Sequence, residues 1–259
     1  MNYDELKETS IWCLYEKARN YNNMIGIYTD TDKNYRMYNG DQWHGLKAKG
    51  IEPVQLNIIK PIVKYKVGTI NNNLYLPVYS ADNFDNNEFK EIAIKTCELL
   101  NKLAAKVWEN DSMDYKARSI SKHSAINDEC PVYVTYDNET NLPIHEILSK
   151  NDVCYGNEND SNIQNQPYIL IKQRKPVINI IEMARKEQIS EDKIQYILSD
   201  NNTSEEAGDS SKLEIDDMCT LITKLYKENG TVHFSQATRF CEIKEDKDTG
   251  LTLYPLTHM

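Results

Sequence analysis

Residues 38–70, which read YNGDQWHGLKAKGIEPVQLNIIKPIVKYKVGTI, contain the densest run of shape-determining residues in this 259-residue chain. Asn39, Gly40 and Asp41 favour a tight turn, because Asn and Gly tolerate a positive φ and Asp bonds nearby backbone amides. Trp43 follows this turn directly. The order of residues predicts that Gly40 has a positive φ and that Trp43 is mostly buried.

The second half of this stretch has the periodicity of a helix. Apolar side chains recur every three or four residues, as in a helix that buries one face. They are Leu56, Ile58, Ile59, Ile62, Val63 and Val67. Pro61 fits the first turn of such a helix or would kink it. Residues 71–73 are three asparagines, which accept the left-handed geometry that ends many helices, so the helix is expected to end there.

This order of residues resembles the portal proteins of tailed bacteriophages, in particular the siphovirus-type family. Those proteins carry a Y-x-G-x-Q-W motif followed by a helix of the type N-x-I-K-P-I-V-x-x-x-V-G. The residues that match here are Tyr38, Gly40, Gln42 and Trp43, then Asn57, Ile59, Lys60, Pro61, Ile62, Val63, Val67 and Gly68. Further along, an extended segment at 76–79, a helix at 88–109 and strands at 131–136 and 168–173 follow the order expected for the family.

The resemblance implies a structural function rather than catalysis. Portal proteins form a twelve-subunit ring at one capsid vertex, through which DNA is packaged and ejected. The implied partners are other copies of the chain, the large terminase subunit, scaffold or capsid protein, the head-tail connector, and duplex DNA without sequence specificity. The implied location is the virion, and the host cytoplasm during assembly. The resemblance implies no cofactor and no metal.

Portal proteins continue beyond the wing-type region into a stem helix, a clip and a crown, which this sequence does not contain. The chain is therefore expected to be an N-terminal part: a fragment, a truncated prophage gene or one part of a split portal. On this expectation it has no enzymatic activity, binds duplex DNA only weakly and does not form a closed ring.

The hydrophobic pattern predicts an α+β fold, mainly helical over 1–126 and rich in antiparallel strands over 127–259. A first helix is expected at 2–30, with a loop starting at Asp30. The helix over 88–109 is expected to bury one apolar face, and a helix over 114–126 follows it. From Pro131 the period changes to two, which is typical of strands.

The second half of the chain contains further local signals. Asn229-Gly230 favours a tight hairpin turn. Strands are expected at 131–136, 144–148, 153–155, 168–174, 218–225, 231–234, 240–243 and 251–256, turns at 137–140 and 246–250, and helices at 179–186 and after Ser190. Residues 199–212 are Ser-rich and acidic, which predicts an exposed insert.

Composition limits the classes of function. The formal net charge is −10, which argues against a surface that grips nucleic acid throughout, although an acidic channel through which DNA slides remains compatible. The six cysteines are scattered without a C-x-x-C pair, which predicts free thiols in a reducing cytoplasm. No signal-peptide pattern or membrane-length apolar run is visible in the sequence, so neither secretion nor membrane insertion is expected.

One pattern suggests catalysis. Glu242-Ile243-Lys244 is an E-x-K triplet on a predicted strand, and Asp216 and Asp217 lie upstream. Metal-dependent nucleases use an acid and an E-x-K strand to hold a metal and orient water. In a chain with 27% charged residues such a triplet also arises by chance. A nuclease, and a non-catalytic adaptor module that reuses the wing fold, are the alternatives to a portal.

The sequence carries no recognisable metal motif. His44, His123, His145, His233 and His258 show neither H-x-x-x-H nor H-E-x-x-H spacing. Asp152, Glu158 and Asp160 lack the alternation of a calcium loop and are expected to form a solvated face.

A basic patch accompanies the motif region. It contains Lys47, Lys49, Lys60, Lys64 and Lys66, with Trp43, Tyr65 and Tyr75 interleaved. These lysines are candidates for contact with DNA phosphates or with an acidic partner, and they equally suit the solvent-exposed side of a helix.

Overall fold

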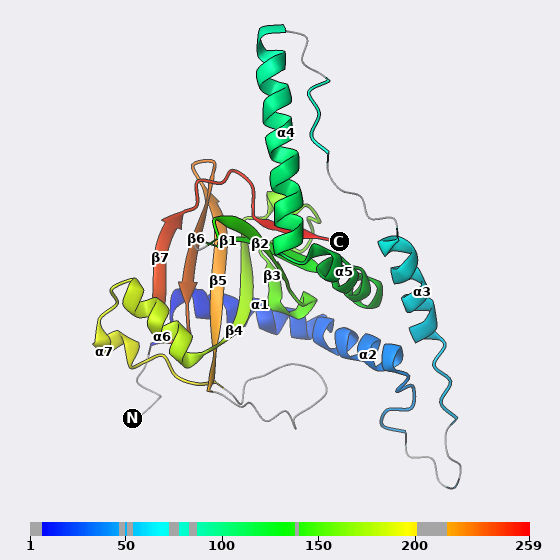
Figure 1. The fold of residues 1–259 in the computed structure, drawn as a ribbon. Helices are drawn as coiled ribbons and strands as arrows, with labels where there is room; N and C mark the ends of the chain where they lie inside the picture. Colours follow the sequence, from blue (N-terminus) through cyan, green and yellow to red (C-terminus); the bar gives the residue numbers. More distant parts are fainter. Residues whose placement is uncertain are drawn as a thin grey trace. The chain divides into compact units, whose positions relative to one another are not determined.

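A computed structural model describes residues 7–46, 50, 54–72, 78–82, 87–137, 140–200 and 217–259, and it confirms the α+β fold (Figure 1). Along these residues five helices come first: α1 (Ser10–Met24), α2 (Ile27–Asn39), α3 (Ile59–Asn71), α4 (Asn87–Asn110) and α5 (Met113–Asn127). Antiparallel strands follow: β1 (Pro131–Asp137), β2 (Leu142–Ile147), β3 (Val153–Tyr155), β4 (Tyr168–Pro176), β5 (Met218–Glu228), β6 (Thr231–Ala237), β7 (Glu242–Asp248) and β8 (Leu256–His258). Helices α6 (Val177–Lys186) and α7 (Glu191–Ile194) lie between β4 and β5.

The chain forms two compact units. Unit 1 comprises Met1–Arg36 and Leu148–Thr257, and unit 2 comprises Met37–Ile147 and His258–Met259. Each unit contains both helices and strands. The change of hydrophobic period near residue 126 therefore separates kinds of secondary structure, whereas the compact units are assembled from segments that are distant in the sequence.

Unit 1 is built on a five-stranded antiparallel sheet of order β3-β4-β5-β6-β7. Strand β5 is central and is buried on both faces. Leu221 packs with Ile180 of α6 in one hydrophobic cluster, and Ile222 packs with Trp12 of α1 in another. Because successive strand residues point to opposite faces, one helix layer covers each side of β5.

The first helix is fixed at its start to the end of the sheet. The Thr9 hydroxyl accepts a hydrogen bond from the Trp12 backbone N–H at 3.3 Å, as an N-cap residue does. The same hydroxyl donates to the Thr238 carbonyl at 3.0 Å, and the Thr9 N–H donates to the Arg239 carbonyl at 2.9 Å. This capping residue therefore sets where α1 begins against the sheet.

The predicted loop from Asp30 is wrong, because α2 continues to Asn39. Asp32 and Arg36 form an ion pair one helical turn apart. Thr31 is buried and its hydroxyl donates to Asn151 Oδ1 at 3.0 Å. The hydrogen bond from Thr31 to Asn151, a residue 120 positions away, helps to hold this segment as a helix, although the local sequence favoured a loop.

Unit 2 contains the β1–β2 hairpin, which belongs to a three-stranded sheet of order β2-β1-β8. The backbones of Cys130 and Met259 exchange hydrogen bonds of 3.1 and 3.2 Å. The strand predicted at 251–256 is wrong for most of its length, since β8 begins only at Leu256. The Gln164 side chain bonds the N–H and the carbonyl of Tyr254 instead, so these backbone groups need no strand partner.

Helix α4 confirms the helix predicted over 88–109, but its apolar face is not buried. Small residues of α4 are half-buried, namely Ala93, Cys97 and Ala104. The large residues on the adjoining side are exposed, namely Phe89, Ile92, Leu99, Leu100 and Leu103. The periodicity thus identified the helix correctly, but no described part of the chain covers its large apolar side chains.

Several further local predictions are confirmed. Pro61 lies in the first turn of α3, and the helix ends at Asn71, although the capping residue Asn72 has right-handed geometry. The Asn229-Gly230 turn joins β5 to β6, with φ values of 51° and 88°. In contrast, the strand predicted at 240–243 and the turn predicted at 246–250 are misplaced, because β7 runs from Glu242 to Asp248. Residues 201–216, which include most of the expected insert, and residues 76–77 of the expected extended segment lie outside the described residues.

The structure also bears on the cysteines and on membrane insertion. All six cysteines are free thiols, as predicted. Burial raises the pKa of the Cys219 thiol to about 12. Among the helices described, none combines the length and the apolar character needed to cross a membrane.

Helix α6 provides a test of the unit 1 core. Ile180 is fully buried, whereas Ile178 on the same helix is 70% exposed. We expect Ile180→Ala to destabilise unit 1 by about 2–5 kcal/mol, because it removes buried methyl groups and leaves a cavity. Ile178→Ala, the matched control, is expected to change stability by less than about 0.5 kcal/mol. Urea unfolding, monitored by hydrogen exchange of the β5 amides, would measure the stability of both variants. Equal destabilisation by the two substitutions would contradict a core centred on Ile180.

Candidate functional site

Three motif residues, Tyr38, Gly40 and Lys60, meet at the side chain of Asn57. Its Nδ2 donates a hydrogen bond to the Tyr38 carbonyl at 2.9 Å, at the end of α2. Its Oδ1 accepts from the Lys60 backbone N–H at 3.0 Å, in the first turn of α3. Asn57 therefore connects the end of one helix to the start of the next.

The turn residues approach this connection closely. Gly40 has φ 88°, as predicted, and a Cβ at this position would lie 2.9 Å from Asn57 Nδ2. The Gln42 side chain donates to the Leu56 carbonyl at 2.8 Å, and Trp43 Nε1 donates to the Val54 carbonyl at 3.1 Å. The motif thus has a structural role, which is to hold residues 54–57 beside the turn.

The prediction that Trp43 is mostly buried is wrong. Its side chain is 42% exposed. The indole N–H donates a hydrogen bond to the Val54 carbonyl. The ring itself belongs to no hydrophobic cluster among the described residues. Turn chemistry predicted the backbone at Gly40 correctly but could not determine what would cover the indole.

A pocket of about 610 Å³ lies between α3 and α5, within unit 2. Lys64, Arg118 and Lys122 supply positive charge to its lining. The other lining residues are Tyr38, Val63, Val67, Gly68, Asn71, Asn72, Tyr115 and Ser119. The lining combines cations with apolar and hydroxyl groups, which suits an anionic group carried on a larger molecule.

Two further features of this pocket concern its polar atoms. The amino groups of Lys60 and Lys122 lie 5.7 and 5.5 Å from the centre of the Tyr38 ring, within the range of cation–π attraction. Asn71 Nδ2 donates to the Val67 carbonyl at 2.7 Å, while its buried Oδ1 has no hydrogen-bond partner among the described residues.

Only part of the predicted basic patch lies at this pocket. Lys64 lines the pocket and Lys60 lies over Tyr38, whereas Lys66 is exposed and is not part of the lining. Lys47 and Lys49 lie outside the described residues. Arg118 and Lys122 come from α5, and their part in a basic site was missed because the sequence does not reveal that α5 packs against α3.

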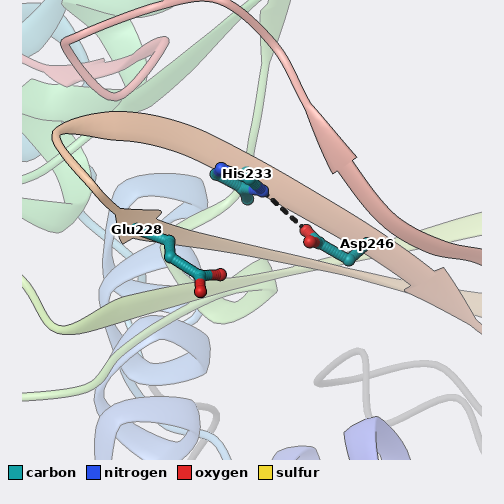
Figure 2. Close-up of side chains that lie close together, drawn as sticks. All are labelled: Glu228, His233 and Asp246. Atoms are coloured by element: carbon teal, nitrogen blue, oxygen red, sulfur yellow. Dashed lines mark hydrogen bonds and ion pairs between the residues drawn. The ribbon is translucent and has the colours of Figure 1, made fainter.

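A second group of functional side chains lies in unit 1, on neighbouring strands. Glu228 ends β5, His233 lies on β6 and Asp246 lies on β7 (Figure 2). One ligand-type atom from each residue lies within 4.8 Å of the others. His233 Nδ1 is 2.8 Å from Asp246 Oδ1, and His233 Nε2 is 3.2 Å from the Thr231 hydroxyl oxygen.

Tyr226 completes the surroundings of this group. Its hydroxyl donates a hydrogen bond to Asp246 Oδ1. Burial, followed by this bond, raises the pKa of the Tyr226 hydroxyl to about 12. The hydrogen bonds from Tyr226 and His233 in turn lower the pKa of the Asp246 carboxyl. Asp246 is therefore held as a carboxylate with a defined orientation.

Other candidate residues have partners within the chain. Lys244 of the E-x-K triplet pairs with Glu187 at 3.5 Å, and its amino group lies 5.4 Å from the centre of the Phe234 ring. Asp216 lies outside the described residues. Asp152 pairs with Lys172 at 2.9 Å, and Asp160 accepts a hydrogen bond from the Asn162 N–H at 2.8 Å.

Comparison of this sequence with known proteins identified no relative. No model of a known protein family matches the chain, and no curated protein matches it in sequence. The resemblance to portal proteins is therefore a hypothesis that depends on the sequence motif at 38–68 and on the order of the elements after it.

The Asn57 connection can be tested at Gly40. Gly40→Ala is expected to destabilise unit 2 by about 1–2 kcal/mol for the positive φ, with a further cost because the new Cβ displaces Asn57. Gly45→Ala is the control, since Gly45 also has a positive φ, 78°, but has no atom within 4 Å of the added Cβ. Loss of the hydrogen bond from the Lys60 amide to Asn57 would speed hydrogen exchange of that amide. Equally fast exchange in both variants would contradict the role of Asn57.

Proposed function

We propose that this chain is the wing-type part of a portal-protein subunit from a tailed bacteriophage. Its function in this proposal is to contribute to the oligomeric ring at one capsid vertex, through which DNA is packaged and ejected and to which the tail connector attaches. Its first partner is another copy of itself. The terminase large subunit, scaffold or capsid protein, the head-tail connector and duplex DNA are the further partners proposed.

The observation that carries this proposal is the exposed apolar surface of unit 2. Phe89, Ile92, Leu99, Leu100 and Leu103 form a stripe along one side of α4, and we name it the α4 stripe. Monomeric soluble proteins seldom leave such contiguous large side chains in water. A ring subunit, in contrast, needs apolar surface that a neighbouring copy covers.

The motif connection supports the same proposal. Of the residues that match the portal pattern, Tyr38, Gly40 and Lys60 meet at Asn57, whose hydrogen bonds fix the path from α2 to α3. A structural protein needs such a fixed path, because subunit contacts depend on the orientation of each helix. The motif therefore fits a protein whose work is assembly.

Self-association through the α4 stripe can be tested with single charges. Leu99 is 67% exposed, so Leu99→Glu should leave folding intact, as measured by circular dichroism. It should raise the dissociation constant for self-association at least tenfold, or about 1.4 kcal/mol, because a buried unpaired carboxylate is costly. Sedimentation equilibrium would measure the constant.

The matched control is Ala105→Glu. Ala105 is exposed on the polar side of α4, and the substitution adds the same charge to the same helix. Association of this variant should equal that of the unaltered chain. A monomeric unaltered chain at high concentration, or equal weakening by both substitutions, would contradict the proposal.

DNA contact can be tested separately from assembly. We expect weak duplex binding without sequence specificity, with an affinity that falls steeply as salt rises. Lys64→Gln should lower the slope of log K against log salt by about one, because one phosphate contact is lost. Lys95→Gln is the control, since Lys95 is exposed on α4 and pairs with Glu91. Fluorescence anisotropy of a labelled duplex would measure both.

The nuclease alternative predicts the opposite outcome in a related assay. Cleavage of duplex DNA that requires a divalent metal and disappears in Glu242→Ala would favour a nuclease over a portal. Sequence-specific binding would also contradict the portal proposal, because a channel that passes the whole genome must not prefer one sequence.

A further inference from the structure

The arrangement of β5, β6 and β7 brings one imidazole and two carboxylates to one side of the unit 1 sheet. In the β5–β6 hairpin, Glu228 is opposite Thr231 and Tyr226 is opposite His233. Because side chains alternate along strands, all four point to the same face. Strand β7 adds Asp246 beside His233 (Figure 2).

A contact with Thr231 holds the His233 ring from its Nε2 side. The Thr231 hydroxyl donates its hydrogen to the Glu228 backbone carbonyl at 3.1 Å. The same hydroxyl oxygen lies 3.2 Å from His233 Nε2. Because Nε2 faces Thr231, Nδ1 is the ring nitrogen that faces Asp246.

The contact between His233 Nδ1 and Asp246 places a nitrogen and an oxygen side by side, both of kinds that bind metal ions. The two atoms are 2.8 Å apart. The Tyr226 hydroxyl already donates to the same oxygen of Asp246. The carboxylate of Glu228 offers a third ligand atom, and the ligand atoms of the three residues all lie within 4.8 Å of one another.

We propose that Glu228, His233 and Asp246 bind one divalent transition-metal ion, with His233 Nδ1 and one oxygen of each carboxylate as ligands. Such ions take nitrogen and oxygen ligands at about 2.0–2.2 Å, so ligand atoms around one ion lie roughly 3–4 Å apart. The distance from Nδ1 to Asp246 is close to this range. The three residues offer atoms within 4.8 Å, and a small rotation of the exposed Glu228 side chain would complete the set.

Charge and neighbouring groups fit such an ion. Glu228 has no ion-pair partner in the described part of the chain, and two carboxylates with a neutral imidazole balance a divalent charge. Thr231 fixes the ring from Nε2 and Tyr226 fixes Asp246, which are the outer contacts that orient metal ligands. The bound ion would join three adjacent strands, and this inference does not depend on the portal proposal.

Mn²⁺ is the appropriate probe for the test. It prefers oxygen and nitrogen ligands to thiolates, so the exposed Cys13 should not compete for it as it would for Zn²⁺. Electron paramagnetic resonance of free Mn²⁺, titrated with the full chain, should show one site. His233→Gln and Asp246→Asn should each lower the affinity at least tenfold, and Tyr226→Phe, which leaves all ligands in place, should lower it severalfold.

His145 provides the matched control. Its Nδ1 is also 2.8 Å from a carboxylate, Asp111, but the third group at that pair is the Lys116 ammonium instead of a second acid. His145→Gln should leave Mn²⁺ binding unchanged.

A measurement on the unaltered chain avoids dependence on how the variants fold. Substoichiometric Mn²⁺ should broaden the ring-proton NMR signals of His233 and leave those of His145 sharp. Equal broadening of both rings, no binding below millimolar Mn²⁺, or unaltered affinity in His233→Gln would each overturn the proposed site.

Discussion

The rest of unit 1 depends on the burial of strand β5 on both faces and on its pairing along both edges. Its backbone is bonded to β4 on one side and to β6 on the other, so its polar groups are satisfied where water is excluded. Leu221 faces α6 and α7 while Ile222 faces α1. A slip of one residue would exchange these faces, so this strand fixes the register of the sheet and the positions of the helices on it.

In the described residues of unit 2 no strand is buried on both faces as β5 is, and large apolar side chains are left exposed. Helix α3 is tied to the end of α2 by the Asn57 hydrogen bonds and packs against α5, but the large side chains of α4 have no described cover. A partner that covered these side chains would gain the free energy of burying them. A second copy of the chain would supply the missing cover, which is why the proposed role is assembly.

The alternation that buries β5 also produces the proposed metal site. Ile222 lies under α1, whereas Tyr226 and Glu228, on the same face and further along the strand, do not belong to that hydrophobic cluster. Polar side chains can occupy this end of the sheet without loss of core. Three neighbouring strands then bring two acids and an imidazole close together outside that hydrophobic cluster.

Local chemistry in the sequence determined much of this protein. The Asn229-Gly230 turn, the positive φ of Gly40 and the extent of α4 follow from residues close together in the chain, so they could be predicted. The pairing of the β5–β6 hairpin, counted from the Asn229-Gly230 turn, is also enough to place Glu228 near His233. Asp246 could not be found in this way, because irregular pairing between β6 and β7 decides what lies beside His233. The α2 extension, the exposure of Trp43 and the α5 part of the basic pocket likewise depend on distant residues, and only tertiary packing brings those together.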